Sequence, residues 1–319
     1  MVMTTGAHPK DLWPGVKAHF GHTYDEHMVE WSEIFDQEGS EKSFEERVQY
    51  VGLGLAPVKS QGAAIDFDSA KQGYVSRITN ITYALGGVVT REAIEDGQYS
   101  SVAERIARYI AFSIRQTCEN VGANVLNRAT TSGYNGGDGV VLATASHPEF
   151  NGLQSNLLTA ADLSEAALED MLIKIMDAVD SRGLKISLIG QKLIIPTALA
   201  FEATRILDSI QRSGTANNDI NALKSMGMLP GGVSVNHYLT DSDAWHVKTN
   251  AMEGMIAQNR RAVEFDKDNE FQTENALMKG SIRMGFGWAD WRGIYHSAGA
   301  AEYVNLTMLA GGLITSLLL

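Results

Sequence analysis

Histidines are the first residues of this chain whose type and spacing could do chemistry. Three of the eight histidines, His19, His22 and His27, lie close together near the N-terminus, as metal ligands often do. A zinc site uses a signature such as His-Glu-x-x-His or pairs of cysteines, and the chain has neither, because Cys118 is its single cysteine. We therefore expect surface or packing histidines, and we predict no metal site.

Two other segments look like ligand-binding loops but lack the residues that define them. Acids stand at positions 1, 3 and 5 of a possible calcium loop that begins at Asp266, but Phe271 replaces the required glycine and Leu277 the glutamate. The glycine-rich segment 133–139 follows a predicted helix and lacks the Gly-Lys-Ser/Thr of a phosphate loop. Ser146 precedes His147, but no Gly-x-Ser-x-Gly elbow is present. We predict no catalytic residue and no cofactor.

The composition describes a folded protein with an acidic surplus. The chain has 319 residues, of which 44% are hydrophobic and 20% charged, so it can bury a sizeable core. Its 26 basic and 38 acidic residues give a net charge of −12. Proteins whose main task is to bind nucleic acid instead cluster Lys and Arg against the phosphates. The single cysteine also excludes an internal disulfide framework.

The two ends of the chain differ in character. The start has no apolar segment typical of a secretory signal. Residues 305–319 are apolar and uncharged, but this segment is shorter than the roughly 20 residues that span a bilayer. We expect a packed or buried tail rather than a membrane anchor, and no membrane partner.

The first half of the chain predicts an arm, a hairpin and a long helix. Residues 1–50 carry scattered aromatic residues without a sustained period, which indicates either an irregular subdomain on its own chain or an arm that embraces a neighbour. From Leu55 to about Thr90, alternation of β-branched and polar residues predicts two strands joined by a turn, a hairpin that needs another surface to complete it. Residues 100–129 predict a continuous helix, with isoleucines and valines at helical spacing.

An α/β unit, residues 153–249, is expected to interrupt the surrounding structure. Its predicted elements are a helix capped by Thr159 and Asp162 and stopped by Gly183, a buried strand at 185–196, a helix at 198–213, a loop at 214–232 and two more strands. From 254 to 296 the pattern is again typical of strands, with a charged hairpin in the middle. In that hairpin, bases and acids alternate in a way that suits ion pairs with a partner or an ordinary solvated face.

Four ordered stretches, together with the helices between them, resemble one known family over residues 12–300. They are LWPGVKAHFGHTYDEHMVEWSEIF (12–35), SFEERVQYVGLGLAPVKSQGAAIDFDSAKQGYVSRITNITYALGGVVTREAIEDGQY (43–99), LTDSDAWHVKTN (239–250) and RRAVEFDKDNEFQTENALMKGSIRMGFGWADWRGIYHSAGA (260–300). The chain is similar in them to the major capsid proteins of tailed double-stranded DNA bacteriophages.

The resemblance implies an α+β fold, the tailed-phage major capsid fold, with named parts. These are an N-terminal arm (1–52), a long hairpin called the E-loop (53–95) and a first part of the P-domain with a long spine helix (96–152). An inserted A-domain (153–249), a second part of the P-domain (250–299) and the apolar tail (300–319) complete the chain. The loop from Ser213 to Leu229 would lie near the axis of the capsomer.

The resemblance also implies a function in assembly rather than catalysis. Copies of the chain would form hexamers and pentamers that close into an icosahedral head around double-stranded DNA, bound without sequence specificity, in the virion capsid assembled in the host bacterial cytoplasm. Implied partners are a separate scaffolding protein, a portal protein and a decoration or cement protein. An encapsulin-type compartment and a soluble α/β enzyme are the alternatives. Our candidates for intersubunit contacts are Trp31, Lys59, Lys71, Arg77, Arg260, Arg261, Glu264, Asp266 and Asp268.

Overall fold

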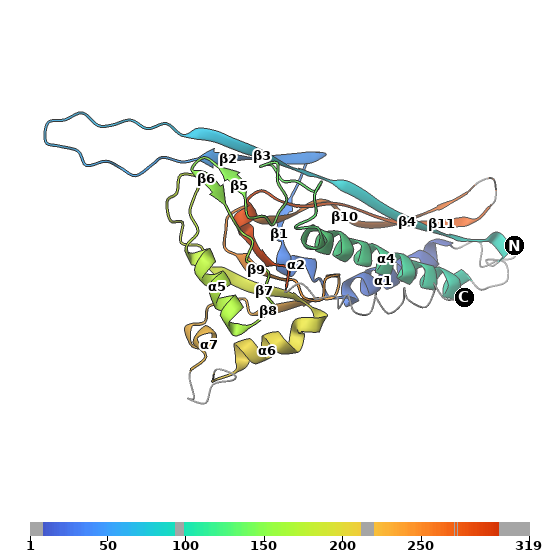
Figure 1. Ribbon diagram of the computed structural model, residues 1–319. Coiled ribbons are helices and arrows are strands. Elements are labelled where there is room, and N and C mark those ends of the chain that lie inside the picture. The colour runs from blue at the N-terminus through green and yellow to red at the C-terminus, as the bar shows by residue number, and fades with distance from the viewer. Residues whose placement is uncertain (1–8, 93–98, 212–219, 271, 273, 300–319) are drawn as a thin grey trace, which may run out of the picture.

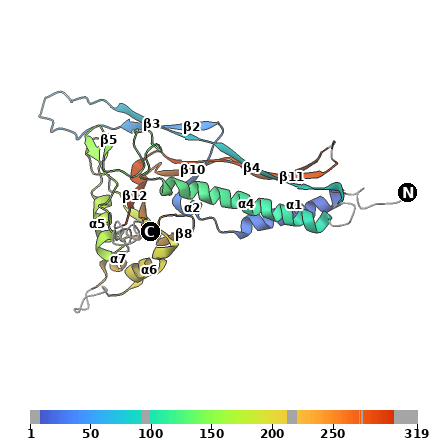
Figure 2. The ribbon, with the colours of Figure 1, turned by 45° about the vertical axis from the view of Figure 1, so that its right-hand side comes forward.

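The molecule is elongated, with a long loop projecting from one end and a two-stranded hairpin reaching the other (Figures 1 and 2). The computed structural model describes residues 9–92, 99–211, 220–270, 272 and 274–299. The apolar tail 300–319 and residues 213–219 of the loop expected near the capsomer axis lie outside these residues. No helix in the described part of the chain is long and apolar enough to cross a bilayer.

A four-stranded sheet and the long helix build the first half of the fold. The strands β1 (Asp36–Gly39), β10 (Met255–Asn269), β11 (Ala276–Trp288) and β4 (Ile81–Val89) lie in the order β1-β10-β11-β4. Helix α4 (Tyr99–Asn127) lies along one face of this sheet (Figure 1). Its buried stripe, which includes Ile110, Ile114 and Cys118, has the spacing that the sequence predicts. The expected spine helix is confirmed.

Glycines in the sheet allow this helix to approach closely. A β-carbon at Gly280 of β11 would lie 2.5 Å from the Cδ1 atom of Ile114, and one at Gly87 of β4 would overlap Ile106. Real β-carbons do not approach other atoms so closely, so any larger residue would push the helix away from the sheet. The two glycines therefore set the distance between the layers.

The prediction of an irregular N-terminal segment was wrong for residues 9–26, which form helix α1 (Pro9–Glu26). Val16, Phe20 and Tyr24 follow one another at four-residue spacing, the helical signal that the scattered aromatics concealed. Val16 and Phe20 are buried against the chain's own core, where the Phe20 ring stacks on Phe265 with 4.5 Å between centroids. Of the two alternatives, packing on the same chain is confirmed for this helix.

The hairpin is formed by other strands than those predicted. Its first strand is β2 (Phe44–Val51), which pairs with β3 (Lys71–Thr79), and residues 52–70 form the loop between them. Strands β3 and β4 follow one another with only Asn80 between them. The Asn80 side-chain amide donates to Ser40 Oγ at 2.7 Å and to the Lys42 carbonyl, so the strand changes partner here, from β2 to β11.

The second unit is built on its own sheet, in the order β12-β9-β7-β8. Its strands are β7 (Gly190–Pro196), β8 (Val233–Asn236), β9 (Trp245–Thr249) and β12 (Ile294–Ser297), so its last strand comes from beyond the predicted boundary at 249. The helices are α5 (Glu165–Met176), η2 (Thr197–Leu199) with α6 (Ala200–Asp208), and α7 (Ala222–Met226). The predicted cap of the first helix was wrong: Ser164 caps α5, which ends well before Gly183.

Short elements join the two halves. They are α2 (Trp31–Ile34), β5 (His147–Glu149) paired with β6 (Gly152–Gln154), and the 3-10 turn η3 (Trp291–Gly293). Each half has its own hydrophobic core, one beneath α4 and the other between α5, α6 and the second sheet. Strands β5 and β6 lie close to where the projecting loop leaves the body (Figure 1), whereas α2 contacts β1 and α4.

Candidate intersubunit surfaces

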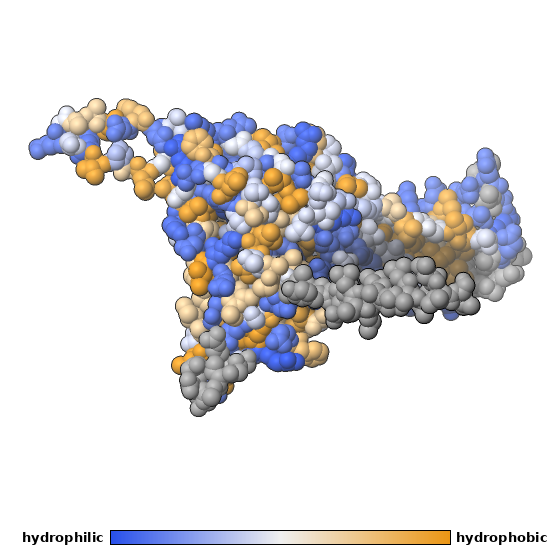
Figure 3. Space-filling model, viewed as in Figure 1, coloured by the Kyte–Doolittle hydropathy of each residue, from blue (hydrophilic) through white to orange (hydrophobic). Residues whose placement is uncertain are grey.

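The loop 52–70 is the most exposed part of the described chain, and it carries large apolar side chains. Every residue from Gly52 to Ala70 is exposed. Val58, Phe67 and Leu55 are 98%, 95% and 83% exposed. Figure 3 shows these hydrophobic groups along an arm that stands away from the body. Because burial of one such side chain contributes about 1.5–3 kcal/mol, the loop has the character of a surface that a partner covers.

The backbone of this loop is also largely unpaired. The ladder between β2 and β3 ends at Val51 and Lys71, and beyond it the two legs of the loop share no strand pairing among the described residues. A turn closes the tip, where Ala63 N–H donates to the Ser60 carbonyl at 3.1 Å and Gly62 has a φ of 81°, as the Ser-Gln-Gly segment predicts. The loop therefore offers two extended, solvated legs.

Asp68 holds the base of the loop to the body. Its carboxylate accepts from the Gly54 N–H at 2.9 Å and from Arg182 Nη1 at 2.8 Å. Hydrogen bonds from the Gly54 and Ser69 amides, with Arg182 nearby, lower the pKa of this carboxyl. The ionised carboxylate thus fixes the direction in which the loop projects.

The basic residues predicted on this hairpin lie in three different settings. Lys59 is exposed near the tip, and no described residue pairs with it. Lys71 Nζ lies 4.7 Å from the centroid of the Phe150 ring. Arg77 is bonded within its own hairpin, to Glu46 at 2.6 Å, and lies over the Phe44 ring. Only Lys59 is wholly available to a partner.

The charged hairpin lies at the opposite end of the molecule, on β10 and β11 (Figure 1). A register shift on each side of Arg261 marks an irregularity there, and Arg261 bonds to Ser281 at 2.9 Å and lies 3.5 Å from Glu264. Arg260 is exposed and has no ion pair among the described residues. Asp266 and Asp268 are exposed, and each accepts a hydrogen bond from the next amide in the chain. Arg261 pairs in register with Arg283, which contacts the Asn80 carbonyl at the end of β3, so Arg260 and Arg261 lie far from the hairpin tip. The predicted charges are therefore spread along one chain rather than gathered in one site.

Trp31 lies inside its own chain. It is 7% exposed and packs edge-on against Phe286, with ring centroids 5.4 Å apart. Glu119 of α4 accepts from the Trp31 amide at 2.9 Å and from the Glu30 amide at 3.2 Å. Burial raises the pKa of Glu119 to about 7, against the lowering effect of these two amides. Trp31 has little surface left for a neighbour.

A buried polar network near the base of the loop escaped the sequence reasoning. Arg292 donates to the neighbouring Asp290 at 3.2 Å and to Glu149 Oε1, which comes from a distant segment, at 2.9 Å. Gln49 Nε2 of β2 donates to Glu149 Oε1 at 3.3 Å, so the network also binds the hairpin to the body. The sequence did not predict this network, because no spacing in it indicates that Glu149 and Arg292 meet.

His147 occupies a second buried position beside this network. Its Nδ1 lies 2.6 Å from Asp138 Oδ2, and its Nε2 lies 3.0 Å from the side-chain oxygen Oδ1 of Asn156. Its ring stacks on Trp291 with 4.1 Å between centroids. Both ring nitrogens are thus engaged, and Ser146 bonds to Thr144 instead. His147 holds loops together and is not paired with a nucleophile.

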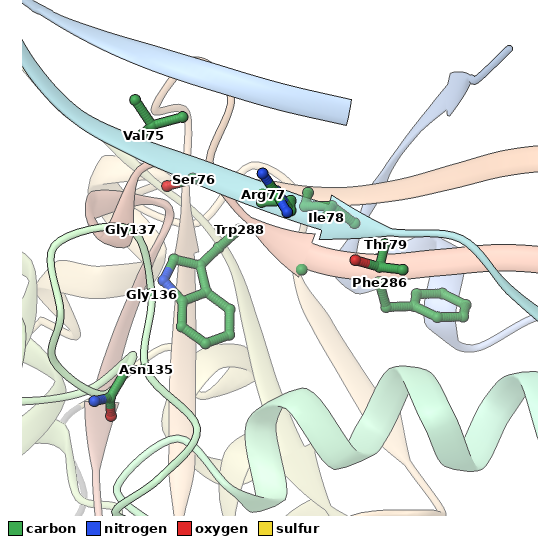
Figure 4. A pocket seen from close by; sticks show the side chains of 11 residues that line it. Val75, Ser76, Arg77, Ile78, Thr79, Asn135, Gly136, Gly137, Phe286 and Trp288 are labelled. Atoms are coloured by element: carbon green, nitrogen blue, oxygen red, sulfur yellow. The ribbon is translucent and has the colours of Figure 1, made fainter. Parts of the chain in front are cut away.

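One cavity of about 300 Å³ lies between β3, residues 135–137 and the end of β11 (Figure 4). The only ionisable residue that lines it is Arg77, which is already paired with Glu46. Trp288 and Phe286 contribute aromatic walls. Within the described ranges, no group of three His, Cys, Asp or Glu residues is placed to hold a metal.

Comparison with known proteins shows which proteins share this fold. A family model described as phage capsid protein matches residues 74–297. The capsid of a native GTA particle is similar in structure (TM-score 0.54, 14% identity, covering 86% of this chain and 90% of that one). Mycobacterium phage Che8 is also similar (TM-score 0.54, 12% identity, covering 86% of this chain and 93% of that one). So is the capsid of cyanophage P-SCSP1u (TM-score 0.51, 11% identity, covering 86% of this chain and 88% of that one). No curated protein matches the chain.

The chain thus has the fold of phage capsid proteins, in the predicted α+β class. Because the family model matches well over half of its length, the chain belongs to the phage capsid protein family. It is a major capsid protein, its place is the virion capsid, and it associates with copies of itself. The family favours the phage head over an encapsulin-type compartment, and it points to a structural protein rather than a soluble α/β enzyme.

Proposed function

We propose that copies of this chain form hexamers and pentamers that close into an icosahedral head, with the loop 52–70 of each subunit lying on its neighbour. The observation that carries this proposal is the loop itself. Its apolar side chains are almost fully exposed and its backbone is unpaired in the single chain. A second subunit supplies the surface that both features lack.

The energy required of each contact is modest. Covering Leu55, Val58 and Phe67 contributes about 1.5–3 kcal/mol for each side chain, before the cost of ordering the loop is subtracted. Each subunit makes several such contacts at once, so their effects multiply through a high effective concentration. Weak individual interfaces therefore suffice for a closed shell.

Ion pairs at several places along the subunit fix the relative position of the two surfaces in each contact. Lys59, Lys71 and Arg77 on the loop hairpin, and Arg260, Arg261, Glu264, Asp266 and Asp268 on the charged hairpin, are the proposed groups. All of them are exposed in the single chain, so the pairs gain little energy and are screened by salt. Their effect is on which surfaces meet and on how fast they associate.

The remaining partners follow from the same proposal. A separate scaffolding protein guides closure, a portal protein occupies one vertex, and a decoration or cement protein covers the outside. The net charge of −12 suits an inner wall that holds double-stranded DNA weakly and without sequence specificity. The chain acts by assembly and not as an enzyme.

Replacing Val58 and Phe67 by Ser tests the function of the loop. Neither side chain packs on its own chain, so the unfolding temperature of the free subunit should stay unchanged. Particle yield, measured by light scattering and negative-stain imaging, should fall strongly. Full yield from the double variant would remove the loop from the assembly mechanism. Phe201 of α6, which is 78% exposed and lies outside the loop and its base, provides a matched Phe-to-Ser control.

A further inference from the structure

Acids stand at three-residue spacing in the segment that links α1 to β1. They are Glu30, Glu33 and Asp36. The neighbouring Ile34 and Phe35 are buried in the core of the first unit, which is formed by the first sheet with α1 and α4. The segment is therefore fixed to the first unit by its apolar residues, and its acids are left to contact other parts of the chain.

Two of these acids neutralise a pair of lysines on the second sheet. Lys192 of β7 and Lys248 of β9 lie directly opposite each other in the strand register, an arrangement in which like charges destabilise a sheet. Glu33 accepts a hydrogen bond from Lys192. Asp36 accepts one from Lys248 at 2.9 Å. The lysine side chains are only 22% and 15% exposed, so the two acids offset a repulsion that water alone screens poorly.

The third acid reaches the far edge of the same sheet. Glu30 Oε2 accepts from the His237 amide at 2.8 Å, and Glu30 Oε1 lies 2.6 Å from His237 Nδ1. His237 directly follows β8, so the three partners stand on or beside the neighbouring strands β9, β7 and β8. We call the three pairs the latch: Glu30–His237, Glu33–Lys192 and Asp36–Lys248. A cavity of about 480 Å³ lies between the two lysine pairs, so this contact between the units is polar and loosely packed.

Two of the connections between the units cross at one point. Gly254 links β9 to β10 and Gly293 links β11 to β12, and a β-carbon on Gly254 would lie only 2.6 Å from the Gly293 Cα. Glu253 beside them has a φ of 55°, a conformation that costs energy for a residue other than glycine. Lys248 lies opposite Ile294 in the strand register, so the latch begins beside this crossing and extends away from it. Hinges in proteins consist of a few such residues at the ends of elements.

We propose that the latch fixes the orientation of the second unit on the first, and that the second unit turns about the crossing of Gly254 and Gly293 when the latch opens. Glu33 and Asp36 are 46% and 64% exposed, so their ion pairs are weak and are screened by salt. Ile194 of β7 packs in the core of the first unit, so apolar contact persists and the movement is a rotation rather than a separation.

The use of this latch rests on the proposed function, since hexamers and pentamers place the same chain in two different surroundings. Weak polar pairs break and form again at little cost, whereas a closely packed apolar contact does not slide. The latch itself is a property of the single subunit. Its test and the test of the proposed function can therefore fail separately.

Pulsed electron spin resonance measures the distance between the two units in the free subunit. Spin labels are attached at Asn120→Cys on α4 and Asp170→Cys on α5, because both positions are exposed and the native Cys118 is buried. With the latch intact and at low salt, the labels should give one narrow distribution of distances. An open latch should add a second population at a different distance.

Neutralising the latch should increase this second population several-fold. The variant is Glu33→Gln with Asp36→Asn in the labelled protein. The matched control, Glu46→Gln with Glu202→Gln, removes two exposed ion pairs outside the latch and should leave the distribution narrow. One narrow distribution in the latch variant, or an equal second population in the control, would overturn the inference.

A salt titration tests the same inference without any substitution in the latch. Raising the salt concentration from about 0.1 M to about 1 M shortens the screening length from about 10 Å to about 3 Å and should also increase the second population several-fold. Asp36→Lys should do the same at low salt, and Asp36→Lys with Lys248→Asp should restore the narrow distribution. A distribution that does not respond to salt, or that the charge exchange does not restore, would equally overturn the inference. None of these results depends on whether the subunits then assemble.

Discussion

Acidification should destabilise the second sheet through a buried pair of histidines. His246 of β9 and His296 of β12 lie opposite each other, with their Nδ1 atoms 3.1 Å apart. At that distance one ring donates and the other accepts, so the pair is held in its neutral form. Burial lowers the pKa of His296 to about 4, although Asp241 opposes the shift, and burial beside His296 lowers the pKa of His246 well below its usual value.

The sign and size of the effect follow from these shifts. Between a pKa of about 6.5 in the unfolded chain and about 4 in the folded one, the unfolded chain binds more protons, so stability falls as pH falls. From about pH 7.5 to about pH 5, His296 alone should cost about 2 kcal/mol, and His246 adds to it. Glu119 acts in the opposite sense, because its pKa is raised to about 7 and its contribution grows on acidification, also by about 2 kcal/mol.

Urea denaturation of the free subunit at several pH values, followed by tryptophan fluorescence, separates the two groups. Relative to the unmodified chain, Glu119→Gln should steepen the acid loss of unfolding free energy by about 2 kcal/mol. His296→Asn should make it shallower by a similar amount. The reasoning is refuted if His296→Asn leaves the pH dependence unchanged, whatever its effect on stability at neutral pH.

Three further substitutions test other parts of the structure. Arg292→Met leaves the buried Glu149 carboxylate, and the half-buried Asp290 carboxylate, without their cation and should cost about 3–5 kcal/mol in urea denaturation; a loss below about 1 kcal/mol would show that the network is dispensable. Gly280→Ala pushes α4 from the sheet and should cost about 1–3 kcal/mol, whereas Gly39→Ala, where a β-carbon meets nothing within 4 Å, should cost far less; equal costs would contradict this account of layer spacing. Arg260→Glu with Arg261→Glu should lower particle yield and its salt dependence in light scattering, and unchanged yield would count against ion pairs there.

The fold could be predicted from the sequence where its signal is local or long. Helix α4 was predictable from apolar residues at helical spacing, and the strands of the last section from the alternation of apolar and polar residues. Helix α1 was missed because Pro14, Gly15 and Gly21 interrupt a pattern that tertiary contact with α4 nonetheless stabilises. The cap at Ser164 was misplaced because Thr159 offered the same chemistry five residues earlier.

The surfaces were predictable only in part. Composition and pattern identify the loop as exposed, and its basic residues as candidates, but not which of them are already paired within the chain. Arg77 meets Glu46 only because β2 lies beside β3, a pairing that the predicted hairpin did not contain. The network around Arg292 depends on side chains that the fold brings together from distant segments, which spacing cannot reveal.

The mass of the purified protein, measured by light scattering together with negative-stain imaging, tests the central claim most directly. The account predicts closed shells of megadalton mass, or capsomers that close when a scaffolding protein is added. A stable monomer of 34.6 kDa under all conditions would contradict it.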